Sequence, residues 1–514
     1  MPALKAPPMT TLPPVHLAVM QPAGYVHSLG LVDQARYVRY QLRRFGADVT
    51  LAKNRLREDA VNIVFGAHLG FPEEGQHRHA CLFFNLEQLG QGGARVSADY
   101  LRLLRRSAVV DYDPANVASY CDDPKDVPVV PLLHAPYLED AGTPRLEDRP
   151  IDLLFFGSMN PRRRAFIERV EACGVSVSQF DHPIYGAERD HFICQAKAVL
   201  SCHFYESSQF EQARASLCLS LGTPLISERL AATQAPAAYE DAVFWLGDGE
   251  IEPFFRERFG RPEYFDAARA QLASFRGHDP VEAYADLLAF AVGFHEGHGR
   301  TRPAEPWRPR QLNLGSGRDY KPGWLNVDVL DRAEPDLVLD LAQPLQLPIE
   351  QPTRHGGHVL LAEGSLDRIC ANNVIEQVRD LPLLMTHALA LLKDGGEIEI
   401  QTPYEKALTA WQDPASLRAM NENSWVYFTE WFWTLGWFTH RFEMTQSCWI
   451  DSQLQPCGKE LAAFMRVTLR RTPTSPRERT LARAQRADFG GIDDDWPWPV
   501  GVPAALPAQT LAAA

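Results

Sequence analysis

The chain has 514 residues, of which 45% are hydrophobic and 23% are charged, and its formal net charge is −14. This composition is typical of a soluble globular protein, and the length predicts two to four domains. The excess of acidic residues disfavours nucleic acid as the main partner, because phosphate backbones are bound by surfaces rich in Lys and Arg.

Other classes of protein are disfavoured as well. The nine cysteines are scattered without Cys-x-x-Cys spacing, so we expect neither a disulfide framework nor a metal site. The N-terminus has no apolar signal-peptide core, and no stretch approaches the roughly 20 apolar residues that span a bilayer. We therefore expect a cytoplasmic protein without an integral membrane segment.

The first domain is expected over residues 15–135. An apolar strand at Val15–Met20 leads through a glycine loop to Leu31–Phe45, whose apolar residues have helical spacing. The later apolar runs are continuous rather than alternating, as in a parallel sheet that is buried on both faces. The predicted ends of such strands carry His27, His68 and Glu87.

A second α/β domain is expected over residues 151–294. The strand Ile151–Phe156 runs into the loop FGSMNPRRR and then a helix. Such a loop exposes backbone N–H groups at a helix N-terminus, and its arginines add cationic donors, so the segment suits a pyrophosphate. The alternative is that the arginines form a solvated helix start and that Glu211 is an ordinary acid in the first turn of its helix.

The two domains together resemble the GT-B glycosyltransferases. The segments FNLEQ, DLLFFGSMNPRRR and FEQARASLCLSLGTPLISE carry the resemblance, which points to a bacterial family related to spore maturation proteins. It implies a nucleotide sugar as donor substrate, and an acceptor against the first domain with His68 or Glu87 as base. The donor contacts that it implies are Gly157, Ser158, Asn160, Arg163 and Glu211.

A linker is expected over residues 295–310 and a third domain over 311–472. In this domain an apolar strand runs into Gly315-Ser316-Gly317, and Asp328 ends the next apolar run. Glycines let the backbone turn sharply into a helix and approach a ligand, while the acidic side chain accepts hydrogen bonds from ribose hydroxyls. The pattern therefore predicts a nucleotide-type cofactor site.

The order of strands in this domain, with the Gly-Gly turn at 392–397, resembles the class I S-adenosylmethionine-dependent methyltransferases. The resemblance implies S-adenosylmethionine as cofactor. The contacts that it implies are Gly315, Gly317, Asp328, Asp340, Leu341 and Asn372. The segment Ala371–Gln377 lacks both histidines of the family pattern, so another base is needed, and Tyr404 and His440 are the candidates.

Residues 402–442 are rich in Trp, Tyr and Phe, and Asp413-Pro414 with Arg418 resembles an insertion in methyltransferases found with polysaccharide genes. Aromatic faces stack on sugar rings, so the stretch suits a glycan acceptor. The alternative is that these aromatics, among them Phe428, Trp431 and Phe432, are core. An antiparallel hairpin is expected to complete the sheet, and residues 473–514 are expected to be a partly disordered tail.

The fold class predicted is α/β: two tandem Rossmann-like domains of GT-B type, then a class I methyltransferase Rossmann-like domain with a terminal antiparallel hairpin. The predicted function is methyl transfer from S-adenosylmethionine to a glycan, lipid-linked sugar or glycoprotein, coupled to glycosyl transfer. Two alternatives remain open. The first half could be a catalytically silent glycan- or protein-binding module, or the whole chain could be a non-enzymatic scaffold.

Overall fold

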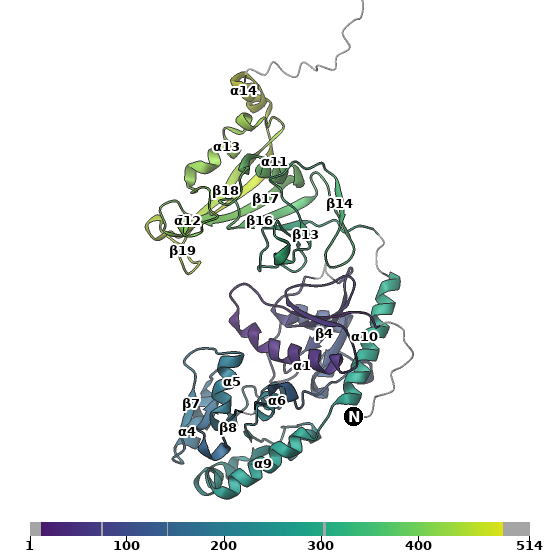
Figure 1. The fold of residues 1–514 in the computed structure, drawn as a ribbon, viewed down its shortest axis with the longest axis vertical. Coiled ribbons are helices and arrows are strands. Elements are labelled where there is room, and N and C mark those ends of the chain that lie inside the picture. Colours follow the sequence, from purple (N-terminus) through teal and green to yellow (C-terminus); the bar gives the residue numbers. More distant parts are fainter. Residues whose placement is uncertain (1–11, 73–75, 141, 302–304, 487–514) are drawn as a thin grey trace, which may run out of the picture. The chain divides into compact units, whose positions relative to one another are not determined.

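A computed structural model describes residues 12–72, 76–140, 142–301 and 305–486 (Figure 1). The described residues form two compact units. The first unit is built on two parallel sheets and also takes in Asp319–Gly323 and Pro352–His358, whereas the second contains a third, mixed sheet. No helix in the described ranges is long and apolar enough to cross a membrane.

The first sheet has the order β2-β1-β3-β4-β5, and all its strands are parallel. Its strands are β1 (Val15–Val19), β2 (Val49–Lys53), β3 (Val61–Phe65), β4 (Ala80–Asn85) and β5 (Ala108–Asp111). Helices α1 (Leu31–Arg43) and α10 (Val281–Thr301) pack on one face, and α2 (Ala98–Arg106) packs on the other. Burial on both faces is why its strands are continuously apolar.

Helix α10 differs from the expectation in two ways. It was expected within the second domain, but its Tyr284, Leu287 and Ala291 are buried in the core of the first sheet. It also runs on to Thr301, so the predicted linker begins as helix. The buried turns hold the helix against the sheet. Each residue that extends the helix beyond them adds one backbone hydrogen bond, so the helix continues past the buried part.

The second sheet has the order β10-β9-β8-β6-β7 and is also parallel. Its strands are β6 (Ile151–Phe155), β7 (Val177–Gln179), β8 (Ala196–Ser201), β9 (Leu225–Glu228) and β10 (Val243–Leu246). Its helices include α4 (Pro161–Glu171), α5 (Ala187–Cys194), α6 (Gln212–Ser220) and α9 (Pro262–Arg276). Counted within each domain, both sheets have the order 2-1-3-4-5, in which ligands bind beyond the carboxyl ends of the first and third strands.

The third sheet has the order β13-β12-β11-β16-β17-β20-β18-β19, and the pairs from β17 onward are antiparallel. Its strands are β11 (Gln311–Leu314), β12 (Leu325–Asp328), β13 (Leu337–Val338), β16 (Leu366–Asn372), β17 (Leu392–Pro403), β18 (His440–Ile450), β19 (Pro456–Cys457) and β20 (Phe464–Pro473). Helix α11 (Leu381–Leu391) connects β16 to β17. The predicted Rossmann-like fold with a terminal antiparallel hairpin is confirmed.

One local expectation for this sheet is wrong. Residues 315–324 form turns and no helix follows the glycines. The segment is short, and its three glycines and Pro322 are poor helix formers, so turns connect β11 directly to β12. Of the predicted tail, Pro476–Arg486 forms helix α14. The part from residue 487 onward lies outside the described residues.

Candidate functional sites

In the second unit, the glycine turn lies where the sheet order reverses. β11 has β12 on one side and β16 on the other, so the chain leaves these strands in opposite directions and opens a crevice at their carboxyl ends. Gly315 and Gly317 have φ of +62° and +47°, and a Cβ on Gly315 would lie 2.3 Å from Val374 Cγ2. Glycine is therefore required at 315, because the turn packs directly against the segment that follows β16.

Asp328 is buried beside this turn. Its Oδ2 accepts the Gly317 N–H at 2.8 Å, and its Oδ1 accepts the Leu330 N–H at 2.8 Å. A carboxylate offers about four lone-pair positions, so each oxygen keeps one for a ligand hydroxyl. Ser316 is also buried, and its Oγ has no partner among the described residues. Two spare acceptors and an unpartnered hydroxyl suit a ribose, so these residues fit the cofactor that the sequence predicts.

The other predicted cofactor contacts differ in their accessibility. Leu341 is part of the buried core, and Asp340 uses Oδ1 to accept the Ala342 N–H at 2.8 Å. Instead, Val329, Leu330 and Val338 form exposed apolar surface where β12 and β13 end. No motif predicted this surface, although the apolar pair Val329-Leu330 directly after Asp328 could have indicated it. A flat apolar ring, such as adenine, suits it.

Asn372 ends β16, and the segment behind it is organised by a buried acid that the sequence analysis did not select. Glu376 accepts the Thr402 hydroxyl at 3.0 Å, and its carbonyl accepts the Leu417 N–H at 2.8 Å. Burial raises the pKa of the Glu376 carboxyl above its ordinary value. Glu376 thus ties the aromatic-rich insertion to the strand ends that border the cofactor turn.

The two predicted bases lie at opposite edges of the sheet. Tyr404 follows the carboxyl end of β17, the edge that also carries the Gly315–Gly317 turn, and its hydroxyl donates to Glu422 Oε1 at 3.3 Å. His440 pairs with Pro473 at the far end of β20, and its Nε2 lies 3.1 Å from Asp394, near the amino end of β17. The structure therefore does not bring His440 to the cofactor turn, because the antiparallel register carries it to the other edge.

Of the aromatics considered as core, Phe428 and Phe432 are buried, but Trp431 is 47% exposed. The core alternative therefore holds for the two phenylalanines and fails for the tryptophan.

In the first unit, a cavity of about 470 Å³ lies between the first and second sheets. Gly157 and Ser158 line it from the end of β6, Glu211 from the start of α6, and His27 from the first domain. The Tyr185 hydroxyl and His27 Nδ1 are 2.8 Å apart and join the two domains at its rim. It is therefore the interdomain crevice that the order of both sheets predicts.

Two arginines line this cavity, Arg189 and Arg214, and the sequence motifs pointed to neither of them. Arg163 is buried, and it donates to the carbonyls of Ser158 and Cys202 and to Glu211, so its guanidinium is used inside the protein. Arg214 lines the cavity, pairs with Glu211 at 2.8 Å, and has a buried Nε with no partner in the described part of the chain. Asn160 caps α4 by accepting the Arg163 N–H at 2.8 Å.

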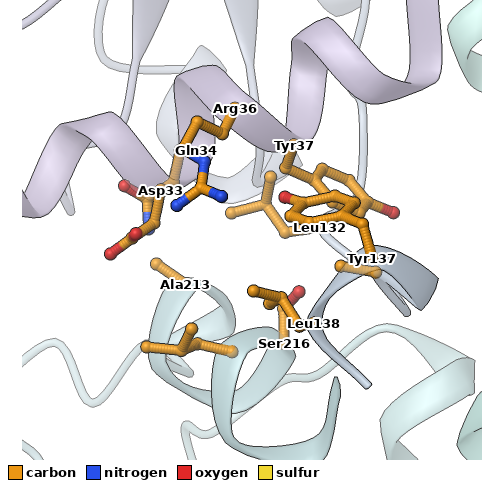
Figure 2. A pocket seen from close by; sticks show the side chains of 11 residues that line it. Asp33, Gln34, Arg36, Tyr37, Leu132, Tyr137, Leu138, Ala213 and Ser216 are labelled. Atoms are coloured by element: carbon orange, nitrogen blue, oxygen red, sulfur yellow. The ribbon is translucent and has the colours of Figure 1, made fainter. Parts of the chain in front are cut away.

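A smaller cavity of about 20 Å³, the size of one water molecule, adjoins the larger one. Figure 2 shows Asp33, Gln34 and Tyr37 on α1 facing Ala213 and Ser216 of α6 across it. Asp33 also lines the larger cavity and accepts a hydrogen bond from Arg189 at 2.8 Å. Side chains of α1 therefore border both cavities where the two domains meet.

His68 and Glu87 come together, as their positions at strand ends predict. His68 Nε2 lies 3.3 Å from Glu87 Oε1, after β3 and β4 respectively. Asn85 holds the Glu87 backbone from both sides, accepting its N–H at 3.2 Å and donating to its carbonyl at 3.0 Å. Neither side chain lines the 470 Å³ cavity.

A buried carboxylate lies beneath this pair. Asp111 ends β5 and accepts hydrogen bonds from Asn85, Asn116, Tyr120 and the Asp113 N–H at 2.8 to 3.0 Å. Burial raises the pKa of Asp111 to about 6. The Asp111 carboxylate orients the Asn85 side chain by a hydrogen bond, and Asn85 in turn positions the Glu87 backbone.

Comparisons with known proteins are consistent with these folds. The family model described as a methyltransferase domain matches residues 263–441. An uncharacterized protein of Acanthamoeba polyphaga mimivirus is 26% identical over 147 residues, which are 27% of this chain and 42% of that protein. The chain thus matches less than half of that relative's length.

Among solved structures, a glycosyltransferase involved in avilamycin A biosynthesis is 13% identical, with a TM-score of 0.37, over 55% of this chain and 98% of that one. Anabaena HepE, in complex with UDP and glucose, is 11% identical with a TM-score of 0.37, over 54% and 98%. A variant of a 16S rRNA adenine methyltransferase of Catenulisporales acidiphilia is 13% identical with a TM-score of 0.21, over 32% and 86%.

The matched segment begins within α9 and includes β11, β12, β16 and β17. The C-terminal half of the chain therefore carries a methyltransferase domain, and the Gly315–Gly317 turn lies within it.

Proposed function

We propose that the second unit transfers a methyl group from S-adenosylmethionine to a glycan or glycoconjugate, and that the first unit is a glycosyltransferase module that uses a nucleotide sugar. The observation that supports the first part best is the environment of Asp328. A buried carboxylate with two spare acceptor positions, a Ser316 hydroxyl without a partner among the described residues and a closely packed glycine turn meet at the reversal of the sheet.

The chemistry needs little beyond positioning. S-adenosylmethionine carries an activated methyl group, so the protein has to hold the acceptor in line with it and remove a proton. Asp328 would bind the ribose hydroxyls, and Val329, Leu330 and Val338 would pack on the adenine. Tyr404 is the base that we propose, because it follows β17 at the same edge and its hydroxyl donates a hydrogen bond to Glu422 at 3.3 Å.

The test is a titration of S-adenosylmethionine, and of its demethylated product, into the wild type and Asp328→Asn. The variant keeps the shape of the side chain but replaces one acceptor oxygen with an NH₂ donor. We expect at least a tenfold weaker Kd, because a hydrogen bond to a charged group contributes about 1.5 to 3 kcal/mol. Asp367→Asn is the matched control, since Asp367 lies near the amino end of the neighbouring strand β16. A wild type that binds neither ligand would refute the assignment.

For the first unit, we propose that the nucleotide part of the donor occupies the 470 Å³ cavity. Arg214 would bind its phosphates, with the backbone of Gly157 and Ser158 beside it. His68, held by Glu87, is the base that we propose for the acceptor hydroxyl. Burial raises the pKa of the Tyr205 hydroxyl, and the charges of Glu87 and Glu211 raise it further.

A silent binding module is the second candidate for the first unit. It is favoured by one observation, that Glu211 is already paired with both Arg163 and Arg214 and so has less capacity for a ribose. The two candidates differ in turnover. If the wild type hydrolyses a nucleotide sugar or transfers its sugar, and His68→Gln loses this activity, the first unit is a glycosyltransferase. If the wild type binds UDP but turns over no nucleotide sugar, the first unit is a silent module.

A further inference from the structure

The second unit contains a large groove away from the cofactor turn. Its volume is about 1070 Å³, and it is bordered by α13 (Val426–Thr429), the short helix Phe432–Leu435, the first residues of β18, and α14. This is more than enough for a sugar chain of a few residues, since pockets of 300 to about 1000 Å³ hold drug-sized ligands.

Aromatic side chains form much of its wall. Trp431 is 47% exposed, and its ring meets that of Tyr427 edge to face at a centroid distance of 5.2 Å. Trp425 also lines the groove and is 1% exposed, and its indole Nε1 has no partner among the described residues. A buried N–H without an acceptor is costly, so this group can donate a hydrogen bond to a ligand oxygen.

The rim of the groove is acidic. Glu478 is paired with Arg441 at 2.8 Å and Glu422 with Lys459 at 2.6 Å. Glu430 and Glu443 also line the groove, and the described residues offer neither of them an ion pair. Carboxylates accept hydrogen bonds from hydroxyl groups and repel anions, so the groove favours an uncharged, hydroxyl-rich ligand over a phosphate or a uronic acid.

The groove is connected to the proposed methyl-transfer site by one shared residue. Glu422 lines the groove and accepts the hydrogen bond of Tyr404, which follows β17 at the edge that carries the Gly315–Gly317 turn. Tyr404 itself is 1% exposed and does not line the groove, so Glu422 is the residue through which the groove adjoins the proposed base.

We propose that this groove is the acceptor subsite of the methyltransferase domain and that it binds an uncharged oligosaccharide, with a sugar ring stacked on Trp431 and hydroxyl groups bound by Glu430 and Glu443. This inference rests on the proposed function and adds to it the class of acceptor and the residues that select it.

The test measures binding of oligosaccharides to the full-length protein by calorimetry. The probes are neutral hexasaccharides of glucose with α and β linkage, of mannose and of N-acetylglucosamine, and the anionic hexagalacturonate. We expect at least one neutral probe to bind, and Trp431→Ala to weaken it about tenfold. The matched control is Trp411→Ala, because Trp411 is 66% exposed but does not line the groove. Glu430→Gln should weaken the neutral probe severalfold.

Two results would overturn the proposal: no binding of any neutral probe, or binding that Trp411→Ala reduces as much as Trp431→Ala. Equal or tighter binding of hexagalacturonate would also contradict it. Titration of S-adenosylmethionine in the same samples separates this proposal from the proposed function. Saccharide binding that depends on Trp431, in a protein that does not bind the cofactor, would keep the groove as an oligosaccharide-binding site but overturn its role as the acceptor subsite of a methyltransferase.

Discussion

Asp111 gives the first domain a pH dependence that can be measured at the level of one residue. Burial raises its pKa from 3.8 to about 6. Between these values the folded protein holds a proton that the unfolded chain releases, so stability falls as pH rises from about 4 to about 6 and is then constant. The change is on the order of 3 kcal/mol, at about 1.36 kcal/mol per pKa unit.

Unfolding of the wild type and Asp111→Asn should be compared from pH 4 to pH 7.5. The wild type should lose stability relative to the variant as pH rises through this window. Asp99→Asn is the control, because the Asp99 side chain is on the same domain but highly exposed. A wild-type advantage that grows with pH would contradict the raised pKa.

Arg214 and Arg163 should respond differently to substitution. We expect Arg214→Gln to weaken UDP binding at least tenfold with little loss of stability, because Arg163 still holds Glu211 in the variant. Replacing Arg163 would instead leave the buried Ser158 and Cys202 carbonyls without their donor, at a cost of about 1 to 3 kcal/mol for each unsatisfied group, although Arg214 would still pair with Glu211. Calorimetric titration of UDP checks this.

The control for Arg214 is Arg162→Gln, since Arg162 is paired with Glu228 at 2.8 Å and does not line the cavity. Equal effects of the two variants on UDP affinity would mean that Arg214 is not the phosphate ligand.

At the level of elements, the turn between β11 and β12 depends on close packing as well as on backbone conformation. Gly315→Ala should cost about 1 kcal/mol for the left-handed φ and about 2 kcal/mol more for the clash with Val374. Gly364→Ala is the matched control, because its φ is +64° but its Cβ would meet nothing closer than 4.0 Å. Thermal unfolding measures both costs.

Adding Val374→Ala to Gly315→Ala should recover part of the lost stability, since it removes the clashing methyl groups. If Gly315→Ala and Gly364→Ala destabilise the protein equally, the packing of the turn against Val374 is not important.

At the level of the whole molecule, the two compact units should unfold in separate calorimetric transitions, each sensitive to its own ligand. At 100 times its Kd, a ligand stabilises its unit by about 2.7 kcal/mol. We expect S-adenosylmethionine to raise one transition and UDP to raise the other, and Asp328→Asn to abolish only the first shift. A single transition that both ligands shift equally would contradict this.

The glycine turn and the strand that ends in Asp328 could be predicted because both are marked by residues close together in the sequence. Gly315, Gly317 and Asp328 lie within a few residues of apolar strands, and strand ends in a parallel sheet meet at one edge. His68 and Glu87 were each predicted at a strand end, and the structure places their side chains 3.3 Å apart. Arg214 was missed because it lies within a helix, where nothing in the local pattern separates it from a surface arginine.

The sequence by itself determined that each of the three domains would be built on a sheet, where most strands of these sheets lie, and which strand ends carry polar groups, because these features follow from apolar runs and glycines close in the chain. Only the tertiary structure decided the rest. The antiparallel register of β18 and β20 carried His440 away from the cofactor turn, and the return of α10 to the first sheet moved it out of the second domain. Both depend on pairings between residues far apart in the chain, which the packing of a whole domain selects and no local pattern encodes.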